Sequence, residues 1–278
     1  RVYLCVVIVL LLLRNDGNIQ SPKGKEKPKA TEDIMNTKTA RQIEEMKKQT
    51  IGVEIEMNSI SRSKAAKLAS QFFGTGRYKN TADRNGYCTY SAWDEQGREW
   101  KFQKDVSIAG IDSEKCEMVT PILNYSDIET LQELVRILRK AGAKSDSTRG
   151  CGVHIHIGAK GHTAKTLRNL ANIMASHEQL LIDALNLDEV RIRRYCKTVD
   201  PRFLEQVNRT KPETMSQLAD VWYKSHDENY GRSHHYNGSR YHMLNLHATF
   251  TKGTVEFRLF QFDRPANGKQ NGLHAGQL

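Results

Sequence analysis

Strict alternation of apolar and polar residues predicts several β-strands in this chain. From Ile51 to Met57 every second residue is apolar, and the positions between are Gly52, Glu54 and Glu56. Successive side chains of a strand point to opposite faces, so one face of this strand is apolar and the other carries two carboxylates. The same criterion predicts strands at residues 100–103, 153–157, 243–250 and 254–260, with a Lys-Gly turn at 252–253 joining the last two as a hairpin.

Apolar residues at helical spacing predict helices between these strands. Residues 126–142 begin with Ser126-x-x-Glu129, a capping-box signature, and residues 163–187 carry a long apolar stripe. Shorter helices are expected at 36–48, 63–73 and 213–224, and a long loop at 227–240, a length that is often functional. We therefore expect an α+β fold, in which helices cover the apolar face of a sheet and leave its polar face open.

Composition and charge narrow the functional classes. Of 278 residues, 38% are hydrophobic and 27% are charged, which excludes a disordered or polytopic membrane protein. The net charge is +10, and most of it lies beyond residue 34, so an anionic partner such as a nucleotide or phosphate is expected. The five cysteines form no C-x-x-C pair, which argues against structural zinc and favours reduced thiols in a cytoplasmic protein.

The N-terminal segment has a different character. Val2 to Leu13 is an apolar run of twelve residues, shorter than the ~20 that span a bilayer, and a Lys- and Pro-rich linker follows it. It is either a truncated membrane stub or translated upstream sequence with Met35 as the start, and we favour the second interpretation. We expect residues 1–34 to lie outside the fold and residues 35–278 to form one catalytic domain. His274 to Leu278 carries no signal that ends an element, so truncation there is left open.

The polar faces of the predicted strands, and one further segment at 115–121, carry side chains that can ligate metal ions. These are Glu54, Glu56, Glu117, His154, His156 and Glu256, with Arg258 two residues after the last. A Glu-x-Glu pair alone is usually a solvated sheet face, and Glu-x-Arg is usually a cross-strand ion pair. His-x-His is more specific. Together, carboxylates that would repel one another favour a cation between them, and an oxygen-rich set suits Mg²⁺ or Mn²⁺.

Other residues of the same region fit an anionic substrate. Lys104, Arg240 and Arg258 are candidate clamps for phosphate or carboxylate groups. Gly52 and Gly152 precede the charged strand positions, where a missing side chain permits close approach of a ligand or backbone.

The order of these motifs resembles that of the putative amidoligase family, which contains carboxylate–amine ligases of the glutamine synthetase and glutamate–cysteine ligase type. The resemblance runs from about Ile51 to Phe260 and rests on order and spacing more than on any single motif. It is carried by Gly52-Val-Glu-Ile-Glu56, Lys104-Asp-Val-Ser107, Glu117-Met-Val-Thr-Pro-Ile-Leu123, Gly150-Cys-Gly-Val-His-Ile-His-Ile157, Arg240-Tyr-x-x-Leu-Asn245 and Thr254-Val-Glu-Phe-Arg258.

The resemblance implies a largely antiparallel sheet curved around a funnel-shaped site, with ATP, two or more Mg²⁺ ions and an acyl-phosphate intermediate. It implies that His156 lies near the phosphates, that Arg240 and Arg258 stabilise the transferring phosphoryl group, and that Asp105 helps to bind the amine or the acid. The metal ligands that it implies are Glu54, Glu56, Glu117, His154 and Glu256.

An ATP-dependent ligase acting on small-molecule or peptide substrates is therefore our interpretation of the sequence. A metal-dependent nuclease or phosphoesterase could use the same ligands, but no aromatic and basic stripe for nucleic acid is evident. A non-catalytic binding module on a ligase-like fold is the third interpretation, and the presence of every motif glutamate weighs against it. Nucleic acid is not expected as a partner. A membrane is not expected either, unless the N-terminal apolar run is genuine.

Deletion of residues 1–34 tests the predicted boundary. A chain that begins at Met35 should keep its melting temperature within about one or two degrees of the full chain, because a change of ~1 kcal/mol shifts the midpoint by only a few degrees in a domain of this size. Thermal unfolding followed by circular dichroism measures this. A midpoint lower by ten degrees or more would mean that the apolar run packs into the core.

Overall fold

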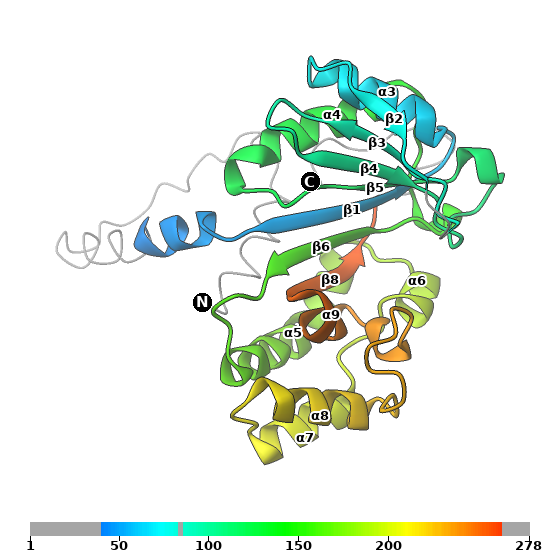
Figure 1. Cartoon of the computed structure of the whole chain (residues 1–278). Coiled ribbons are helices and arrows are strands. Elements are labelled where there is room, and N and C mark those ends of the chain that lie inside the picture. Colours follow the sequence, from blue (N-terminus) through cyan, green and yellow to red (C-terminus); the bar gives the residue numbers. More distant parts are fainter. Residues whose placement is uncertain (1–39, 83–85, 263–278) are drawn as a thin grey trace, which may run out of the picture.

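The structure, a computed structural model, describes residues 40–82 and 86–262. The predicted apolar run, the linker and the C-terminal segment from residue 263 onward lie outside the described residues, so the predictions for them stay untested. The described residues build an open eight-stranded sheet in the order β2-β3-β4-β5-β1-β6-β8-β7, and each of its strand pairs is antiparallel (Figure 1). The predicted α+β class with an antiparallel sheet is confirmed.

The strands follow the predicted alternation closely, apart from the last hairpin. They are β1 (Ile51–Met57), β2 (Tyr78–Asn80), β3 (Tyr90–Trp93), β4 (Glu99–Gln103), β5 (Cys116–Val119), β6 (Val153–Gly158), β7 (Leu244–Asn245) and β8 (Thr254–Phe260).

In the described part, α3 packs on β2, β3 and β4 and contacts α4, whereas α5 lies near β6 and β8 and carries α7 and α8 on its far side (Figure 1). None of the helices between residues 40 and 262 is long and apolar enough to cross a bilayer. The helical segments are residues 40–47, α3 (Arg62–Phe72), α4 (Ile128–Lys140), α5 (Ala164–Ala184), α6 (Glu189–Arg194), α7 (Pro201–Thr210), α8 (Met215–Ser225) and α9 (His247–Lys252). Short 3-10 helices are η1 (Asp112–Glu114), η2 (Tyr125–Asp127), η3 (Ser147–Arg149) and η4 (Gly238–Arg240).

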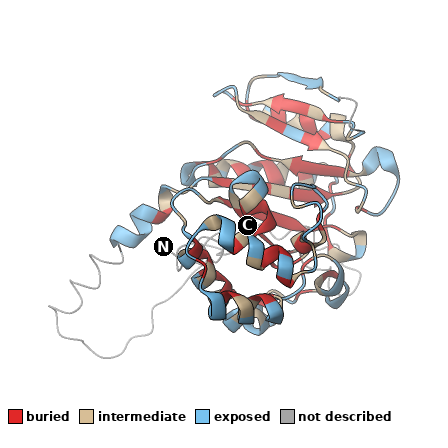
Figure 2. Ribbon diagram, turned by 60° about the horizontal axis from the view of Figure 1, so that its bottom comes forward, coloured by how far each residue is buried: buried red, intermediate tan, exposed pale blue. Residues whose placement is uncertain are grey.

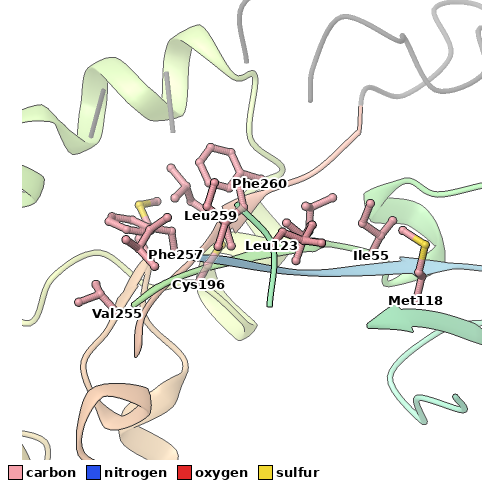
Figure 3. Packing of buried hydrophobic residues seen from close by; sticks show 14 of the residues in the cluster. Ile55, Met118, Leu123, Cys196, Val255, Phe257, Leu259 and Phe260 are labelled. Carbon is pink, nitrogen blue, oxygen red and sulfur yellow. The ribbon is translucent and has the colours of Figure 1, made fainter. Parts of the chain in front are cut away.

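The apolar face of the sheet packs on helices to form one core. Buried residues are concentrated in the strands and on the helix sides that face them (Figure 2). Ile55 of β1, Met118 of β5 and Phe257 of β8 belong to the same buried cluster as the apolar stripes of α4 and α5 (Figure 3). Because side chains alternate along each strand, fixing this face in the core directs the charged residues to the opposite face.

The predicted hairpin of residues 243–260 is wrong in its first arm. Only Leu244 and Asn245 form a strand there, and residues 247–252 turn into helix α9 before β8 begins. Gly253 ends this helix in the left-handed conformation, with a φ of 72°. The Lys-Gly pair therefore marks a helix C-terminus, a role for which glycine is equally suited. Short apolar runs do not distinguish the two structures by sequence alone.

The predicted capping box at Ser126 and Glu129 is also wrong by two residues. The reciprocal hydrogen bonds are made by Asn124 and Asp127, which open η2 before α4. Asp127 is favoured there because its carboxylate accepts two hydrogen bonds from Arg98, at 2.9 and 3.0 Å. Arg98 also donates to Asp94, which in turn accepts a hydrogen bond from the indole of Trp100 in β4. A tertiary ion pair thus decides which local cap forms.

We expect Asp127→Asn to destabilise the fold without touching the polar face. The change removes the charge partner of Arg98 and weakens the capping box of η2. The cost should therefore be about 1–3 kcal/mol, and the melting temperature should fall by several degrees. The Arg98 hydrogen bonds hold the pKa of Asp127 below its usual value, so this stabilisation is present at neutral pH and is lost in acid. Asp183→Asn, at an exposed position on α5, is the control. Equal midpoints for the two variants would contradict the assigned role.

Candidate active site

Cross-strand register gathers the predicted metal ligands on the polar face of the four central strands. Glu54 of β1 is paired with His154 of β6, and Glu56 is paired with Glu117 of β5. On the far side of β6, His156 is paired with Glu256 of β8. Directly paired residues of an antiparallel sheet have Cβ atoms about 4.5–5.5 Å apart, so side chains from four strands form one cluster.

A cavity of about 710 Å³ opens above this cluster. Eight of the ten predicted site residues line it, and they are Glu54, Glu56, Lys104, Asp105, Glu117, His154, Arg240 and Arg258. His156 and Glu256 are not in the lining. They lie beside it, in contact with Glu54 and Arg258 respectively. The cluster and the cavity therefore form a single site.

Histidine and glutamate side chains alternate at one end of the cluster. The Nδ1 atom of His154 lies 3.1 Å from Glu54 Oε2, and the Nε2 atom of His156 lies 3.3 Å from Glu54 Oε1. Both imidazoles are also within 3.9 Å of Glu256 Oε1. Glu256 is held in turn by Asn245 and Arg258, each at 2.6 Å. These groups are buried, apart from Glu54, whose side chain is 16% exposed.

Carboxylates dominate the other end. Glu56 accepts a hydrogen bond from the backbone amide of Gly152 at 2.7 Å, and Glu117 accepts one from Gln103 at 2.8 Å. Carboxylate oxygens of Glu56, Glu117 and Asp105 lie within 4.8 Å of one another, close enough to share an ion. Asp105 is fixed by hydrogen bonds from the backbone amide and hydroxyl of Ser107, as an Asp-x-Ser turn allows.

The carboxyl groups at the two ends of the cluster differ in pKa. Burial alone would raise the pKa of Glu54, but the hydrogen bond to His154 and the close approach of the His156 imidazole bring it well below its usual value. Glu256 is likewise buried, and the charge of Arg258 lowers its pKa to about 2. Burial raises the pKa of Glu56 to about 7, and burial together with the charges of Glu54 and Glu56 raises the pKa of Glu117 well above its usual value.

The residues present fit divalent cations. Three overlapping groups each place three ligand atoms within 4.8 Å, namely Glu54, His156 and Glu256; Glu54, Glu117 and His154; and Glu56, Asp105 and Glu117. The Nε2 atom of His156 is buried and has no hydrogen-bond partner, although Glu54 lies 3.3 Å away. Burial lowers the pKa of His154 to about 4, so this imidazole is neutral, as a metal ligand must be. Oxygen-rich groups of this kind suit Mg²⁺ or Mn²⁺.

Cations and tyrosines form the walls of the cavity. The Arg240 guanidinium lies 5.7 Å from the ring centres of both Tyr236 and Tyr241, and Arg258 lies 5.8 Å from that of Tyr241. Lys252 of α9 approaches Glu54 at 3.5 Å. Lys104, a predicted phosphate clamp, forms a salt bridge with Asp112. The structure thus brings every predicted cation to the rim or wall of the same cavity.

Several lining residues had no signal in the sequence. Arg191 and Tyr195 come from α6 and its end, a helix too short for a recognisable apolar period. Tyr87 and Tyr236 join distant loops through a hydrogen bond of 3.0 Å between their hydroxyls. Gln103 alternates correctly on β4 and could have been found by the same pattern as the glutamates.

The comparisons with known proteins agree with this geometry. The family model described as "putative amidoligase enzyme" matches residues 47–264, most of the chain and all ten predicted site residues. This confirms the resemblance drawn from the motifs. No curated protein and no solved structure matches the chain.

We expect Glu56→Gln to weaken Mn²⁺ binding and to change its pH dependence. In the metal-free protein the pKa of Glu56 is about 7, so below that pH a proton must leave before an ion can bind. One such group makes affinity about tenfold weaker at pH 6 than at pH 8. Titration of free Mn²⁺ by electron paramagnetic resonance should show this rise with pH in the wild type and a smaller rise in Glu56→Gln.

The fold should survive this change, because glutamine keeps an oxygen that can accept the Gly152 hydrogen bond. Glu133→Gln, at an exposed position on α4, serves as the control and should bind Mn²⁺ as the wild type does. Unchanged affinity in Glu56→Gln would identify the carboxylates as an ordinary polar sheet face.

Proposed function

Because the chain belongs to the family of putative amidoligase enzymes, we propose that it is an ATP-dependent ligase that joins a carboxylate to an amine. A carboxylate oxygen attacks the γ-phosphorus of ATP, which releases ADP and leaves an acyl phosphate. The amine nitrogen then attacks the acyl carbon, the C–O bond to phosphate breaks, and the amide nitrogen loses a proton. In this proposal the sheet curves around a funnel-shaped site, as in the catalytic domain of glutamine synthetase.

One observation supports this function more than any other. Three overlapping groups of metal ligands share residues and adjoin a single cavity with arginine and lysine in its walls. A solvated sheet face needs no such convergence, whereas phosphoryl transfer needs both divalent ions and cationic side chains around the phosphates. Mg²⁺ or Mn²⁺ held by these ligands would offset the negative charge of the phosphates.

The chain's own residues would position the reactants. Glu256 orients the guanidinium of Arg258 through Nη1, and the Nε atom donates to the carbonyl oxygen of Tyr195 at 3.5 Å, so the Nη2 group would contact a phosphoryl oxygen. Arg240 lies near Tyr236 and Tyr241, where it would contact a second oxygen. Lys104 would add charge at the rim, and Asp105 would bind the amine. Loop 227–240 would exclude water from the acyl phosphate.

Hydroxamate formation tests the reaction. Hydroxylamine is a small nucleophile that can replace the amine, so the enzyme with ATP, Mg²⁺ and the correct carboxylic acid should produce a hydroxamate and an equal amount of ADP. A panel of amino acids, dicarboxylic acids and short peptides supplies the acid. The alternative, a metal-dependent nuclease or phosphoesterase, would instead cleave DNA or a phosphodiester without ATP. That cleavage, with no hydroxamate or ADP from any acid, would overturn the ligase proposal.

Glu117→Gln is the most informative variant in this assay. Burial raises the pKa of Glu117, and its carboxylate accepts a hydrogen bond from Gln103 that a glutamine oxygen can also accept. Glutamine should therefore be tolerated structurally but should remove a shared metal ligand. Hydroxamate and ADP should both fall by orders of magnitude. Glu256→Gln is less suitable, since it would leave Arg258 buried without its partner. Glu205→Gln, an exposed position on α7, is the matched control.

A further inference from the structure

Arg191 is the one arginine of the cavity wall, among the described residues, that is buried and forms no salt bridge, although its charge lowers the pKa of nearby Glu56. It belongs to α6 and is 4% exposed, yet it lines the cavity. Its Nη2 atom donates to the carbonyl oxygen of Arg258 at 2.8 Å, and its Nε atom is buried with no hydrogen-bond partner. Arg258, equally buried, is paired with Glu256 instead. Of these two neighbouring guanidinium groups, one therefore has a carboxylate partner and the other has only a backbone carbonyl.

The position of Arg191 depends on a missing side chain. A Cβ atom at Gly152 would lie 2.0 Å from Arg191 Nη2 and 2.3 Å from its Cζ and Nη1 atoms, so only glycine admits the guanidinium at this point, just before β6. Gly152 also makes two hydrogen bonds with Glu56. The amide of Gly152 donates to the Glu56 carboxylate, and the amide of Glu56 donates to the carbonyl oxygen of Gly152. The slot therefore sets the guanidinium beside the carboxylate end of the cluster.

A structural role explains only part of this arrangement. The bond to the Arg258 carbonyl ties α6 to β8, but it uses one of five N–H donors. A permanently charged group removed from water is strongly unfavourable unless an anion and further acceptors compensate it. A neutral donor could hold the same carbonyl at less cost. A guanidinium retained here, with donors to spare and facing a cavity, indicates an anionic ligand.

We propose that Arg191, admitted by Gly152, forms an oxyanion-binding subsite in the cavity wall and recognises a carboxylate or phosphoryl group of the substrate. The planar fork of arginine matches two oxygens of such a group at once. The proposal rests on the function proposed above, because it places this group within the same cavity. The oxyanion is either a non-reacting carboxylate of the acid or a phosphate of the nucleotide, and both present the same chemistry to the fork.

Direct binding distinguishes these two sources without requiring turnover. Glutarate serves as the carboxylate probe and magnesium tripolyphosphate as the phosphate probe, each titrated into the full chain by calorimetry at pH 8. The wild type should bind at least one of them. Arg191→Gln should weaken that probe by about tenfold or more, as expected when one partner of a buried charge pair is removed. Arg191→Lys should restore only part of the loss, because an ammonium cannot form the fork.

Two further variants separate the subsite from a general loss of structure. Arg193→Gln removes an exposed arginine of the same helix and should leave the affinity for both probes unchanged. Gly152→Ala keeps Arg191 in the chain but displaces its guanidinium, so it should reproduce the loss seen in Arg191→Gln. Gly52→Ala on the neighbouring strand is its control, since a Cβ there would meet His156 Cβ at an ordinary 3.5 Å. Melting temperatures are measured for all variants.

The outcomes decide the proposal independently of the ligase activity. A loss confined to glutarate assigns the subsite to the acid, and a loss confined to tripolyphosphate assigns it to the nucleotide. Both support the subsite even if no hydroxamate is ever formed. Equal affinities in Arg191→Gln and Arg193→Gln, or no binding of either probe to the wild type, would overturn it even if the ligase reaction is demonstrated. Arg191 would then be a purely structural tie between α6 and β8.

Discussion

The burial of several carboxylates on one sheet face is the constraint on which the rest of this structure depends. Antiparallel pairing of β1 with β5 and β6 places Glu56 opposite Glu117 and Glu54 opposite His154. Like charges at these distances repel strongly when water is excluded. The fold offsets this repulsion with two histidines and a buried arginine, and with raised pKa values of the carboxyl groups of Glu56 and Glu117.

The carboxyl pKa values divide the cluster into two parts, one with lowered and one with raised values. Glu54 and Glu256 are kept ionised by neighbouring histidines and by Arg258, so they attract an ion at any physiological pH. Glu56 and Glu117 have raised pKa values because they are buried beside other carboxylates. They can exchange protons for a second ion, so the metal-free protein avoids an excess of buried negative charge. The same carboxyl groups can therefore be neutral in the metal-free protein and ionised when they bind a metal ion.

Much of the cavity wall comes from elements other than the sheet. The floor is built from strands of the sheet, whereas α6, α9 and the loop at 227–240 contribute Arg191, Lys252, Tyr236 and Arg240 to the walls. Loops and short helices on a rigid sheet can vary without disturbing the core. The match to the amidoligase family model spans both the floor and the walls. Arg191 is the buried wall arginine whose Nε atom has no hydrogen-bond partner, and the proposed oxyanion subsite rests on it.

The sequence by itself determined the faces of the strands, because side-chain direction in a strand follows from a period of two and needs no tertiary information. Alternation alone therefore assigns Glu54, Glu56, His154 and Glu256 to the polar sides of their strands. It could not determine the register that sets their pKa values, nor that residues 247–252 are helical, since short apolar runs suit both helix and strand. Only tertiary packing brings Arg191 into the slot at residue 152, because contacts between distant segments leave no local pattern in the chain.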